Sequence, residues 1–522
     1  MRHMRALVNN VWDSTYLERL EGCRARALAG GGQERIDAQH RKNKLTARER
    51  LEILFDPQSF TEVGALVESR IDDFGADKKR VPGDGVVTGY GKINGRLVFA
   101  SSEDFTVFGG TLGEAHSMKI CRMLDMALEM RAPVVMLNDS GGARIEEGIC
   151  ALAGYAGIFR RNTAASGIIP QIAVIMGPCA GGACYSPAIC DFVFMVRQTG
   201  MMFITGPQVV RAVTGQRIDQ QELGGADMHT RRSGAVHFAY DDDRSCLLAV
   251  RKLLAYLPQN SGESAPVMEG EPNDLCRGLQ QMVSDNQRKC YDVKAVIGAM
   301  VDKHSFFEVH KEFAPNAVTG FARLNGDTVG FAANQPNCLG GSLDVNASDK
   351  LARFVRFCDA FHIPIVTLVD VPGYMPGSEQ EQGGIIRHGA KVLYAYAEAS
   401  VPKVTVILRK AYGGAYIAMN SKELGADIVY AWPIAEIAVM GAEGAVDIIF
   451  RKQIAAAGDD SEVRDQHIQA YKEKFMNPYI AAARGFVDEV IRPEETREKL
   501  AAALEMLKGK RRAACTHGNI PL

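Results

Sequence analysis

The sequence predicts an α/β protein made of two tandem domains, and three observations carry this prediction. Pro133–Asp139 recurs as Pro364–Asp370, at an offset of 231 residues (364 − 133). The turn Gly181-Gly182-Ala183 recurs as Gly413-Gly414-Ala415, at an offset of 232 (413 − 181). Between these repeats, strand-like and helix-like segments alternate. Solenoid units run to about 20–50 residues, so a period this long indicates a duplicated domain.

Composition agrees with two globular domains and excludes several functions. A chain of 522 residues exceeds what one hydrophobic core usually organises. Its 60 basic and 62 acidic residues give a formal net charge of −2, which gives no basis for nucleic acid as a partner. None of the 12 cysteines forms a Cys-x-x-Cys pair, so we predict no metal site and expect reduced thiols. Asp13, Glu18 and Arg19 interrupt any signal-peptide pattern, and we expect a cytoplasmic protein.

The N-terminal residues and the first hairpin have clear local signals. Residues 1–60 are charged and helix-like, and Thr46 and Glu49 have the spacing of a capping box before an apolar run. Val86–Ile93 and Arg96–Ala100 flank Asn94-Gly95, the favoured two-residue hairpin turn. We therefore expect a helical extension followed by a β-hairpin, with a second hairpin around Asn325-Gly326.

A helix and then two apolar strands follow each hairpin. The pattern predicts helices over 114–130 and 348–361, and next strands that end in Asp139 and Asp370. After a further helix come the strands 170–176 and 402–408, which lead into the two Gly-Gly-Ala turns. Strands and helices that alternate in this way predict right-handed crossovers and α/β layers.

The Pro-, Gly- and Ser-rich stretch after Leu257 marks the domain boundary. We predict an extension over 1–60, a first domain over 61–262, a linker over 263–285 and a second domain over 286–522. The second copy lacks the equivalent of residues 69–85, which we expect to form an exposed loop.

The Gly-Gly-Ala turns are candidate oxyanion sites. A strand that leads through glycines into a helix presents backbone amides at the strand's carboxyl end, where negative charge is favoured. The turn Asp139–Arg144 would form the other edge of the same pocket. A single such turn is more often ordinary turn geometry, but its recurrence in the second copy favours function. Each amide in an oxyanion hole contributes about 3–4 kcal/mol of transition-state stabilisation.

Other signals have a structural alternative. Lys119, between Met118 and Ile120, resembles a biotinyl lysine, but it lies in a predicted core helix and we reject it. Lys44, Arg48 and Arg50 are candidates for phosphate contacts, although a solvated helical face is the more common explanation. His388 is a candidate base that is more often structural. The sequence shows no Ser-His-Asp or Cys-His arrangement.

Eight ordered motifs together resemble the carboxyltransferase subunits of biotin-dependent acyl-CoA enzymes. The resemblance runs from about residue 20 to the C-terminus and is closest to the propionyl-CoA carboxylase beta, methylmalonyl-CoA carboxyltransferase 12S and methylmalonyl-CoA decarboxylase alpha type. The motifs are Gln39–Arg50, Asp104–Gly110, Asn138–Ile145, Gly177–Ala183, Phe203–Pro207, Asp370–Gly373, Arg409–Ala415 and Ala438–Gly444.

The resemblance implies a fold and a division of labour between the domains. It implies two tandem crotonase-like (ClpP/crotonase) domains of ββα repeats, with acyl-CoA held by the first domain and biotin by the second. The catalytic amides would be those of Gly181 and Gly182 for the thioester, and of Gly414 and Ala415 for biotin. The residues expected to line the substrates are Gly141, Gly142, Ala143, Arg144, Ala183, Tyr185, Gly413 and Ile417.

The resemblance also implies partners. The chain has no Ala-Met-Lys-Met biotin site, so biotin would arrive on a separate biotin carboxyl carrier protein. A biotin carboxylase subunit or membrane decarboxylase subunits would load or unload it. Relatives assemble as homohexamers with active sites between subunits. Biotin itself would serve as the base, which fits the lack of a conspicuous side-chain base.

The acyl group and the direction of the reaction stay open at this point. Ile417 stands where propionyl-CoA carboxylases usually have aspartate, and it matches transcarboxylase and decarboxylase relatives. We expect transfer between carboxybiotin and propionyl-CoA, with acetyl-CoA as an alternative acceptor. The reverse reaction, in a methylmalonyl-CoA decarboxylase or transcarboxylase, is a second possibility. A crotonase-like hydratase or hydrolase without biotin and a non-catalytic CoA-binding scaffold are alternatives from other classes.

Overall fold

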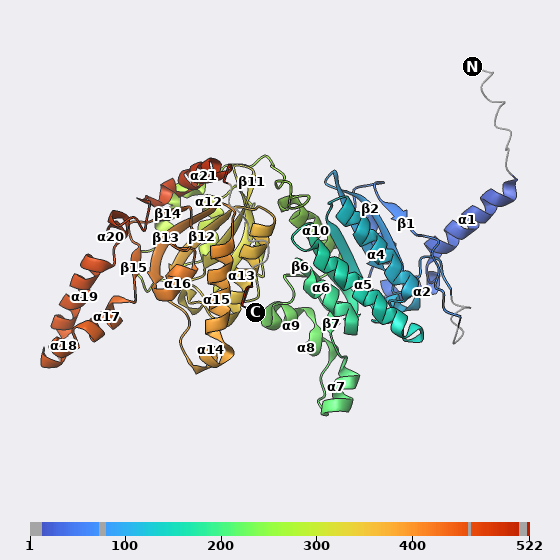
Figure 1. The fold of residues 1–522 in the computed structure, drawn as a ribbon, viewed down its shortest axis with the longest axis horizontal. Helices are drawn as coiled ribbons and strands as arrows, with labels where there is room; N and C mark the ends of the chain where they lie inside the picture. Colours follow the sequence, from blue (N-terminus) through green and yellow to red (C-terminus); the bar gives the residue numbers. More distant parts are fainter. Residues whose placement is uncertain (1–12, 73–79, 458–460, 511–518, 522) are drawn as a thin grey trace, which may run out of the picture. The chain divides into compact units, whose positions relative to one another are not determined.

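A computed structural model describes residues 13–72, 80–457, 461–510 and 519–521. The chain divides into two compact units, Met1–Leu254 (unit 1) and Ala255–Leu522 (unit 2). The colours of Figure 1 run along the sequence from blue, in unit 1, to red, in unit 2. The segment expected to be a linker, residues 263–285, contains two short helices, and Leu279 within it is fully buried in the core of unit 2.

Three helices precede the first strand, namely α1 (Ser14–Ala29), α2 (Gln33–His40) and α3 (Ala47–Leu54). The capping box predicted for α3 is present, with Thr46 and Glu49 bonding each other's backbone N–H groups. Helix α3 buries Arg50, Leu51 and Leu54. Helix α3 of the charged N-terminal segment therefore packs into the core of unit 1.

Unit 1 is built on an eight-stranded sheet in the order β1-β2-β3-β4-β5-β6-β8, with β7 paired to β5. The hairpin β2–β3 turns at Asn94-Gly95 as predicted, and the pairs from β3 to β6 are parallel. The strands are β1 (Thr61–Val63), β2 (Val86–Ile93), β3 (Arg96–Glu103), β4 (Val134–Ser140), β5 (Gln171–Ala180), β6 (Phe192–Val196), β7 (Met201–Phe203) and β8 (Phe238–Tyr240).

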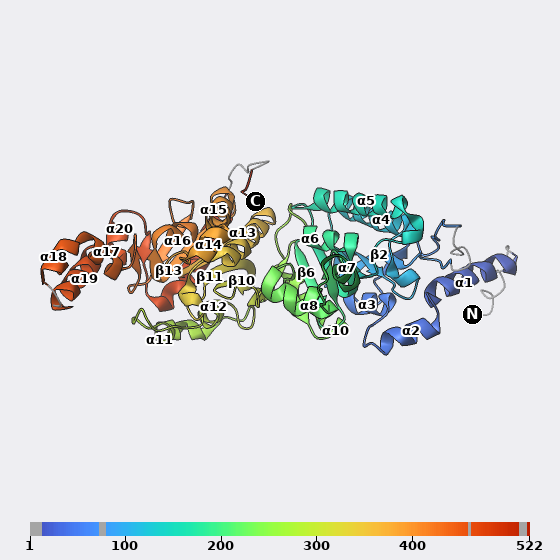
Figure 2. The same cartoon turned by 90° about the horizontal axis from the view of Figure 1, so that it is seen from below.

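Helices cover both faces of this sheet. Figure 2 shows α4 and α5 on one face and α3 and α10 on the other. The helices of unit 1 after β3 are α4 (Glu114–Glu129), α5 (Ile149–Ala165), η4 (Gly181–Cys184), α6 (Tyr185–Ile189), α7 (Pro207–Thr214), α8 (Gln220–Gly224), α9 (Ala226–Met228) and α10 (Asp243–Tyr256), with short turns η2 (Phe108–Gly110), η3 (Ile145–Glu147) and η5 (His229–Ser233).

Unit 2 repeats this sheet strand for strand. Its order is β9-β10-β11-β12-β13-β14-β16, with β15 paired to β13 as β7 is to β5. The strands are β9 (Phe307–Val309), β10 (Ala317–Leu324), β11 (Asp327–Asn334), β12 (Ile365–Val371), β13 (Lys403–Tyr412), β14 (Ile428–Ala431), β15 (Glu436–Ala438) and β16 (Glu489–Val490). The duplication predicted from the sequence is therefore a duplication of the whole sheet.

The helices of unit 2 follow the same plan. They are η6 (Asp274–Gly278), α11 (Leu279–Met282), α12 (Val293–Met300), η7 (Leu339–Gly341), α13 (Val345–Ala360), α14 (Ser378–Gly383), α15 (Ile385–Glu398), α16 (Gly413–Ala418), α17 (Ala442–Ile449), α18 (Arg451–Ala457), α19 (Ser461–Phe475), α20 (Pro478–Ala483), η8 (Pro493–Glu495) and α21 (Thr496–Leu507). None of the helices in the described part of the chain has the length and apolar character needed to cross a membrane.

The duplication also includes α3. Helix α12 spans the same eight positions at an offset of 246 residues (293 − 47). The ion pair Arg48–Glu62 of unit 1 (2.6 Å) recurs at that offset as Lys294–Glu308 (3.6 Å). The structural repeat therefore begins at least as early as Ala47.

Candidate functional site

Two equivalent glycine turns lie at the carboxyl ends of β5 and β13. Gly181 has φ 64° and Gly413 has φ 59°, a left-handed conformation that side chains with a Cβ rarely adopt. Each glycine opens a helical segment, η4 in unit 1 and α16 in unit 2. The first amides of a helix have no acceptor within the helix, so both turns offer backbone N–H groups to a ligand.

An aromatic cluster supports the turn of unit 1 from α5. A Cβ on Gly182 would lie 3.1 Å from the ring of Tyr155. Tyr155 stacks on Phe159 at 5.9 Å, and Phe159 meets Tyr185 edge-on at 6.0 Å. Tyr185 is 46% exposed, whereas Ala183 is buried. The structure therefore leaves Tyr185, of the expected substrate-lining residues, accessible beside the turn.

The second edge of the unit 1 site is the turn after β4. Gly142 has φ 104°, and a Cβ there would lie 2.9 Å from the carbonyl oxygen of Ala180, the residue before Gly181. The Gly142 amide donates to Ser140 Oγ (3.1 Å) and the Gly141 amide to the Gly109 carbonyl (3.1 Å). The two turns expected to form one pocket are thus in direct backbone contact.

Ala143 and Arg144 complete this turn in different ways. Ala143 is half-buried and pairs with Leu112 in an isolated bridge. Arg144 is 2% exposed, and its guanidinium pairs with Asp84 (2.8 Å) and Glu147 (2.7 Å). Its charge is therefore engaged within unit 1, and its position beside the turn is held by these carboxylates.

The turn of unit 2 is more open. Nothing lies within 4 Å of the point where a Cβ on Gly414 would be. Ala415 is fully buried, and Ile417, two residues further along α16, is 46% exposed. Tyr412, directly before the turn, donates from its hydroxyl to Glu436 of β15. Gly414 is thus exposed, with open space on the side where a side chain would stand.

A buried carboxyl group behind the first turn was missed by the sequence analysis. Glu103, at the end of β3, lines a cavity of about 20 Å³ together with Tyr155 and Ala183. Burial raises the pKa of Glu103 to about 8, and the nearby Asp139 carboxylate adds to the rise. The Tyr155 hydroxyl is buried without a hydrogen-bond partner in the described part of the protein. The cavity has room for one water molecule.

The basic residues of the N-terminal segment do not form a solvated face. Lys44 and Arg50 are 6% and 1% exposed, and they pair with the two carboxylate oxygens of Asp139 at 2.7 and 2.9 Å. Arg50 also pairs with buried Asp243 at 2.8 Å. Neither side chain can contact a phosphate group, because both are enclosed. The solvated-face explanation was wrong for these two residues.

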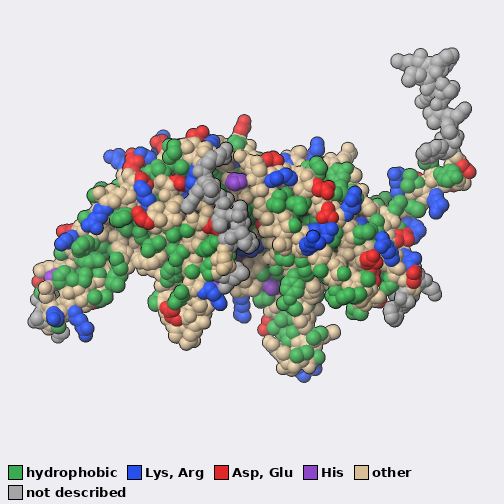
Figure 3. Space-filling model, in the orientation of Figure 1, with side chains coloured by type: hydrophobic (Ala, Val, Ile, Leu, Met, Phe, Trp, Pro, Cys, Tyr) green, Lys and Arg blue, Asp and Glu red, His purple; other side chains and the backbone are tan. Residues whose placement is uncertain are grey.

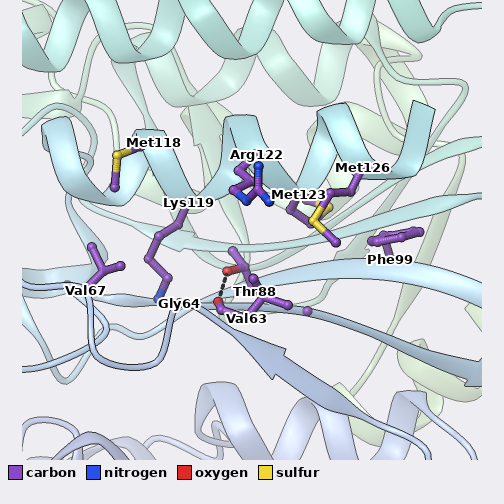
Figure 4. A pocket seen from close by; sticks show the side chains of 11 residues that line it. Val63, Gly64, Val67, Thr88, Phe99, Met118, Lys119, Arg122, Met123 and Met126 are labelled. Atoms are coloured by element: carbon purple, nitrogen blue, oxygen red, sulfur yellow. Dashed lines mark hydrogen bonds between the residues drawn. The ribbon is translucent and has the colours of Figure 1, made fainter. Parts of the chain in front are cut away.

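Lys119 is equally enclosed, at the edge of an apolar cleft under α4. Figure 4 shows its side chain reaching from α4 toward Gly64. Its ammonium group donates to the carbonyls of Gly83 (2.9 Å) and Val86, which makes it a structural residue. The cleft has a volume of about 260 Å³, and the residues that line it include none from the glycine turns.

His388 belongs to a helix–helix contact in unit 2. Its Nδ1 lies 2.8 Å from Asp349 of α13, which also accepts from Lys391 at 2.8 Å. The triad ties α15 to α13. This agrees with the structural alternative for His388.

The comparisons with known proteins agree with this geometry. The family model described as a carboxyl transferase domain matches residues 38–520. The chain belongs to the carboxyl transferase family. The propionyl-CoA carboxylase carboxyltransferase subunit of Haloferax mediterranei is 54% identical, over 97% of this chain and 99% of that protein.

Two further relatives carry other names. The methylmalonyl-CoA decarboxylase subunit alpha of Veillonella parvula is 55% identical, over 95% of this chain and 97% of its own length. The crystal structure of transcarboxylase 12S, a hexamer solved with methylmalonyl-coenzyme A and methylmalonic acid bound, superposes with a TM-score of 0.94 at 53% identity. That superposition covers 98% of this chain and 99% of the other.

These findings confirm the resemblance and the expected fold. The chain is a carboxyltransferase of two crotonase-like α/β domains. The comparisons give no support to a hydratase or hydrolase. The sequence showed no conspicuous side-chain base, whereas the structure places the buried Glu103 of β3 behind the first turn. One signal in the sequence could have indicated Glu103. It lies 231 residues before Asn334 (334 − 103), so the two copies both have a polar residue at this position of the repeat.

Proposed function

We propose that this chain is the carboxyltransferase subunit of a biotin-dependent enzyme. It moves a carboxyl group between carboxybiotin and the α-carbon of a short acyl-CoA, with propionyl-CoA and methylmalonyl-CoA as the preferred pair and acetyl-CoA and malonyl-CoA as the alternative. The observation that carries the proposal is the pair of left-handed glycines, Gly181 and Gly413, at equivalent strand ends. The methylmalonyl-CoA ligand of the superposable transcarboxylase supports the choice of acyl group.

In unit 1, the amides of Gly181 and Gly182 would hold the thioester oxygen of acyl-CoA. That oxygen gains negative charge when the α-carbon is activated, and each amide that donates to it contributes about 3–4 kcal/mol. Gly141, Gly142 and Ala143 would close the other side of the thioester. Tyr185, which is exposed beside the turn, would line the acyl group.

In unit 2, the amides of Gly414 and Ala415 would hold the ureido oxygen of biotin. The residues fit such a ring, because Gly414 leaves open space and lies in the first turn of α16, where amides have no acceptor within the helix. Biotin, when bound, carries the carboxyl group and supplies the base. Ile417 would contact the incoming group from α16.

A partial reaction tests the proposal without any partner protein. Purified chain is incubated with methylmalonyl-CoA and free biotin, and propionyl-CoA is measured by liquid chromatography. We expect formation of propionyl-CoA that depends on biotin. No turnover with methylmalonyl-CoA, malonyl-CoA or any other short acyl-CoA would refute the proposal.

A proline at Ala415 separates catalysis from acyl-CoA binding. Ala415 is the third residue of α16, where proline is compatible with a helix but lacks an amide hydrogen. We expect Ala415→Pro to lose transfer to biotin and to keep its affinity for methylmalonyl-CoA. Unchanged turnover would refute the second amide site and favour a non-catalytic role for unit 2.

The proposed assembly is a homohexamer that receives biotin on a separate carboxyl carrier protein. Apolar side chains exposed on α7 and α17 support subunit contacts there: Val213 is 78% and Ile448 is 66% exposed. Figure 3 shows hydrophobic side chains over these helices. In such a hexamer, unit 1 of one subunit would face unit 2 of another. A cytoplasmic location stays a prediction from the sequence.

The direction of the reaction depends on the partner. A biotin carboxylase subunit would drive carboxylation, whereas membrane decarboxylase subunits would drive the reverse. The decarboxylase and transcarboxylase relatives favour this second direction as much as the carboxylase relatives favour the first. Co-purification of the tagged chain from its native cells identifies the partner: a biotin carboxylase indicates carboxylation, and multispan subunits indicate decarboxylation.

A further inference from the structure

The two units balance the same buried aspartate with charges from different places. Asp139 is the second-last residue of β4 and Asp370 the second-last residue of β12, and both are 1% exposed. Each lies at a register shift between its strand and the next one, directly before a turn at the site. A buried carboxylate needs donors for both oxygens. The source of these donors differs between the units.

In unit 2, both donors come from the neighbouring strand β13. Arg409 Nε donates to Asp370 Oδ2 at 2.9 Å, and the Lys410 amide donates to Oδ1 at 3.1 Å. Val296, on the helix α12, is apolar and fully buried. No residue of that helix is needed to balance Asp370.

In unit 1, the equivalent strand residues can supply neither donor. Gly177 replaces Arg409 and has no side chain, and Pro178 replaces Lys410 and has no amide hydrogen. Lys44 and Arg50 take their place, from the segment that ends in helix α3. Arg50 occupies the position of Val296 at the 246-residue offset (296 − 50). The arginine that balances the aspartate therefore lies on helix α3 in unit 1 and on strand β13 in unit 2.

The glycine is required by this exchange. A Cβ on Gly177 would lie 1.9 Å from Asp139 Oδ1 and 2.7 Å from Lys44 Nζ. The absence of a side chain at this position therefore makes room for the lysine and arginine that reach Asp139 from outside the strand. The arrangement of Gly177, Lys44 and Arg50 works only as a set.

Asp139 connects this set to the glycine turn of unit 1. The residue after it, Ser140, accepts from the Gly142 amide at 3.1 Å. Gly142 in turn packs against the carbonyl of Ala180, which precedes Gly181. Two non-covalent contacts, Ser140 with Gly142 and Gly142 with Ala180, therefore connect the segment of Asp139 to the amides that would hold the thioester.

We propose that Lys44 and Arg50 are positioning residues of the acyl-CoA half-site, acting through Asp139, as Arg409 acts through Asp370 for the other half-site. The inference rests on the proposed function of the two turns. It makes the segment before β1 a working part of the site of unit 1. Disturbing this segment affects the acyl-CoA side selectively, because unit 2 draws its charge from its own strand.

The test compares Lys44→Met with a matched variant of the same segment, Arg48→Met. The guanidinium of Arg48 bonds both carboxylate oxygens of Glu62 and the Ala27 carbonyl, so Arg48 is no longer a candidate for a phosphate contact, and its ion pair is with Glu62 and not with Asp139. Kinetics of methylmalonyl-CoA with free biotin are measured at varied concentrations of each substrate. We expect Lys44→Met to lower kcat/KM for methylmalonyl-CoA by roughly 10- to 100-fold, as misplaced catalytic groups do, with the KM for biotin unchanged. Arg48→Met should change neither, and Arg409→Lys should raise the KM for biotin only.

A double-mutant cycle shows whether Lys44 acts through Asp139. In an Asp139→Asn background, Lys44→Met should have little further effect, because the carboxylate it holds is absent. Losses of kcat/KM that add in the double mutant would overturn the inference. So would equal losses for methylmalonyl-CoA and biotin, or wild-type kinetics of a folded Lys44→Met variant. If Lys44→Met does not fold, Lys44→Gln, which keeps a donor but no charge, is measured against the same outcomes.

The failure of this inference is distinguishable from the failure of the proposed function. Absence of transfer by the wild-type chain refutes the function. In that case calorimetric binding of methylmalonyl-CoA decides the inference: Lys44→Met must bind it more weakly than Arg48→Met does. Equal binding by the two variants overturns it.

Discussion

Arg50 of α3 and Asp139 of β4 form an ion pair of 2.9 Å in which both side chains are 1% exposed. With Lys44 and Asp243, they make a group of two buried cations and two buried carboxylates. Glu103 adds a third carboxyl group, and its Oε2 accepts from the Asp139 amide at 2.8 Å. Because the two cations already balance the charges of the two aspartates, we expect the Glu103 carboxyl group to be protonated and neutral.

Replacing Glu103 by glutamine should therefore change the pH dependence of stability. Burial first, and then Asp139, raise the pKa of Glu103 from 4.5 to about 8 in the folded chain. The folded state then holds more protons than the unfolded state between these values. Stability from this group is present below about pH 4.5 and is lost as pH rises through 8, at up to about 1.4 kcal/mol per pH unit.

We expect Glu103→Gln to match the wild type near pH 5 and to exceed it in stability at pH 8.5. Asn334, the equivalent amide in unit 2, accepts from the Asp370 amide at 3.3 Å and shows that an amide suits the position. The measurement is the urea midpoint of unfolding at several pH values. Exposed Glu114→Gln is the control. A constant difference between Glu103→Gln and wild type across the pH range would contradict the prediction.

The strands, the hairpins and the glycine turns could be predicted because the two copies share them. The buried charges could not be predicted, since Gly177 and Arg409 have nothing in common and their partners lie far away in sequence. The loop at residues 69–85 was expected to be exposed, yet Asp84 at its end is fully buried against Arg144. The expected exposure was wrong for Asp84 and also for Ser69, Ile71, Pro82, Gly83 and Gly85, which are buried, while residues 73–79 lie outside the described part of the chain.

Alanine at Gly181 or Gly413 should reduce transfer, with little loss of fold at Gly181 and a larger loss at Gly413, where a Cβ would lie 3.0 Å from the Val439 carbonyl oxygen. Both positions have positive φ, where a Cβ costs about 1–2 kcal/mol per residue. Space is available at Gly181, whose Cβ would meet only the Ile204 carbonyl at 3.8 Å. We expect the backbone to relieve this strain by rotating. The rotation would turn the amides that follow each glycine away from the thioester or from biotin.

The two alanine variants should differ in which substrate they affect. Gly181→Ala should lower kcat/KM for methylmalonyl-CoA, and Gly413→Ala should lower it for free biotin. Gly340→Ala, also at positive φ with open space but outside both turns, is the control for strain alone. A loss in Gly340→Ala as large as that in Gly181→Ala would show that strain, and not amide placement, reduces the activity.

Alanine at Gly177 should destabilise unit 1 strongly. Its Cβ would overlap Asp139 Oδ1 at 1.9 Å and force the buried carboxylate away from Lys44. Breaking a buried ion pair in this way costs about 3–5 kcal/mol. Gly22→Ala, in the exposed middle of α1 with nothing within 4 Å, should instead stabilise by about 0.5–1 kcal/mol. Thermal unfolding of both variants checks the pair, and equal unfolding temperatures would contradict the packing at Gly177.

Lys350 should contribute more to the free energy of unfolding than an exposed lysine does, because its ammonium group lies close to four backbone carbonyl groups. Its buried Nζ lies within hydrogen-bond distance of the carbonyl oxygens of His310 (2.9 Å), Phe313 (2.8 Å), Ala314 (3.3 Å) and Ala317 (2.6 Å). Methionine fills the same volume but leaves these carbonyls without a donor, at about 1–3 kcal/mol each where no water enters. Burial lowers the pKa of Lys350 to about 7 in the folded chain.

This lowered pKa sets the pH dependence of the Lys350→Met effect. The unfolded chain binds the proton more tightly, so stability from this group is present above about pH 10.5 and is lost as pH falls through 7. The destabilisation by Lys350→Met should therefore be larger at pH 9 than at pH 6. Urea unfolding at both values measures it, with Lys508→Met, whose side chain is 56% exposed, as the control. A loss no greater than that of Lys508→Met would mean that the four carbonyls find other donors.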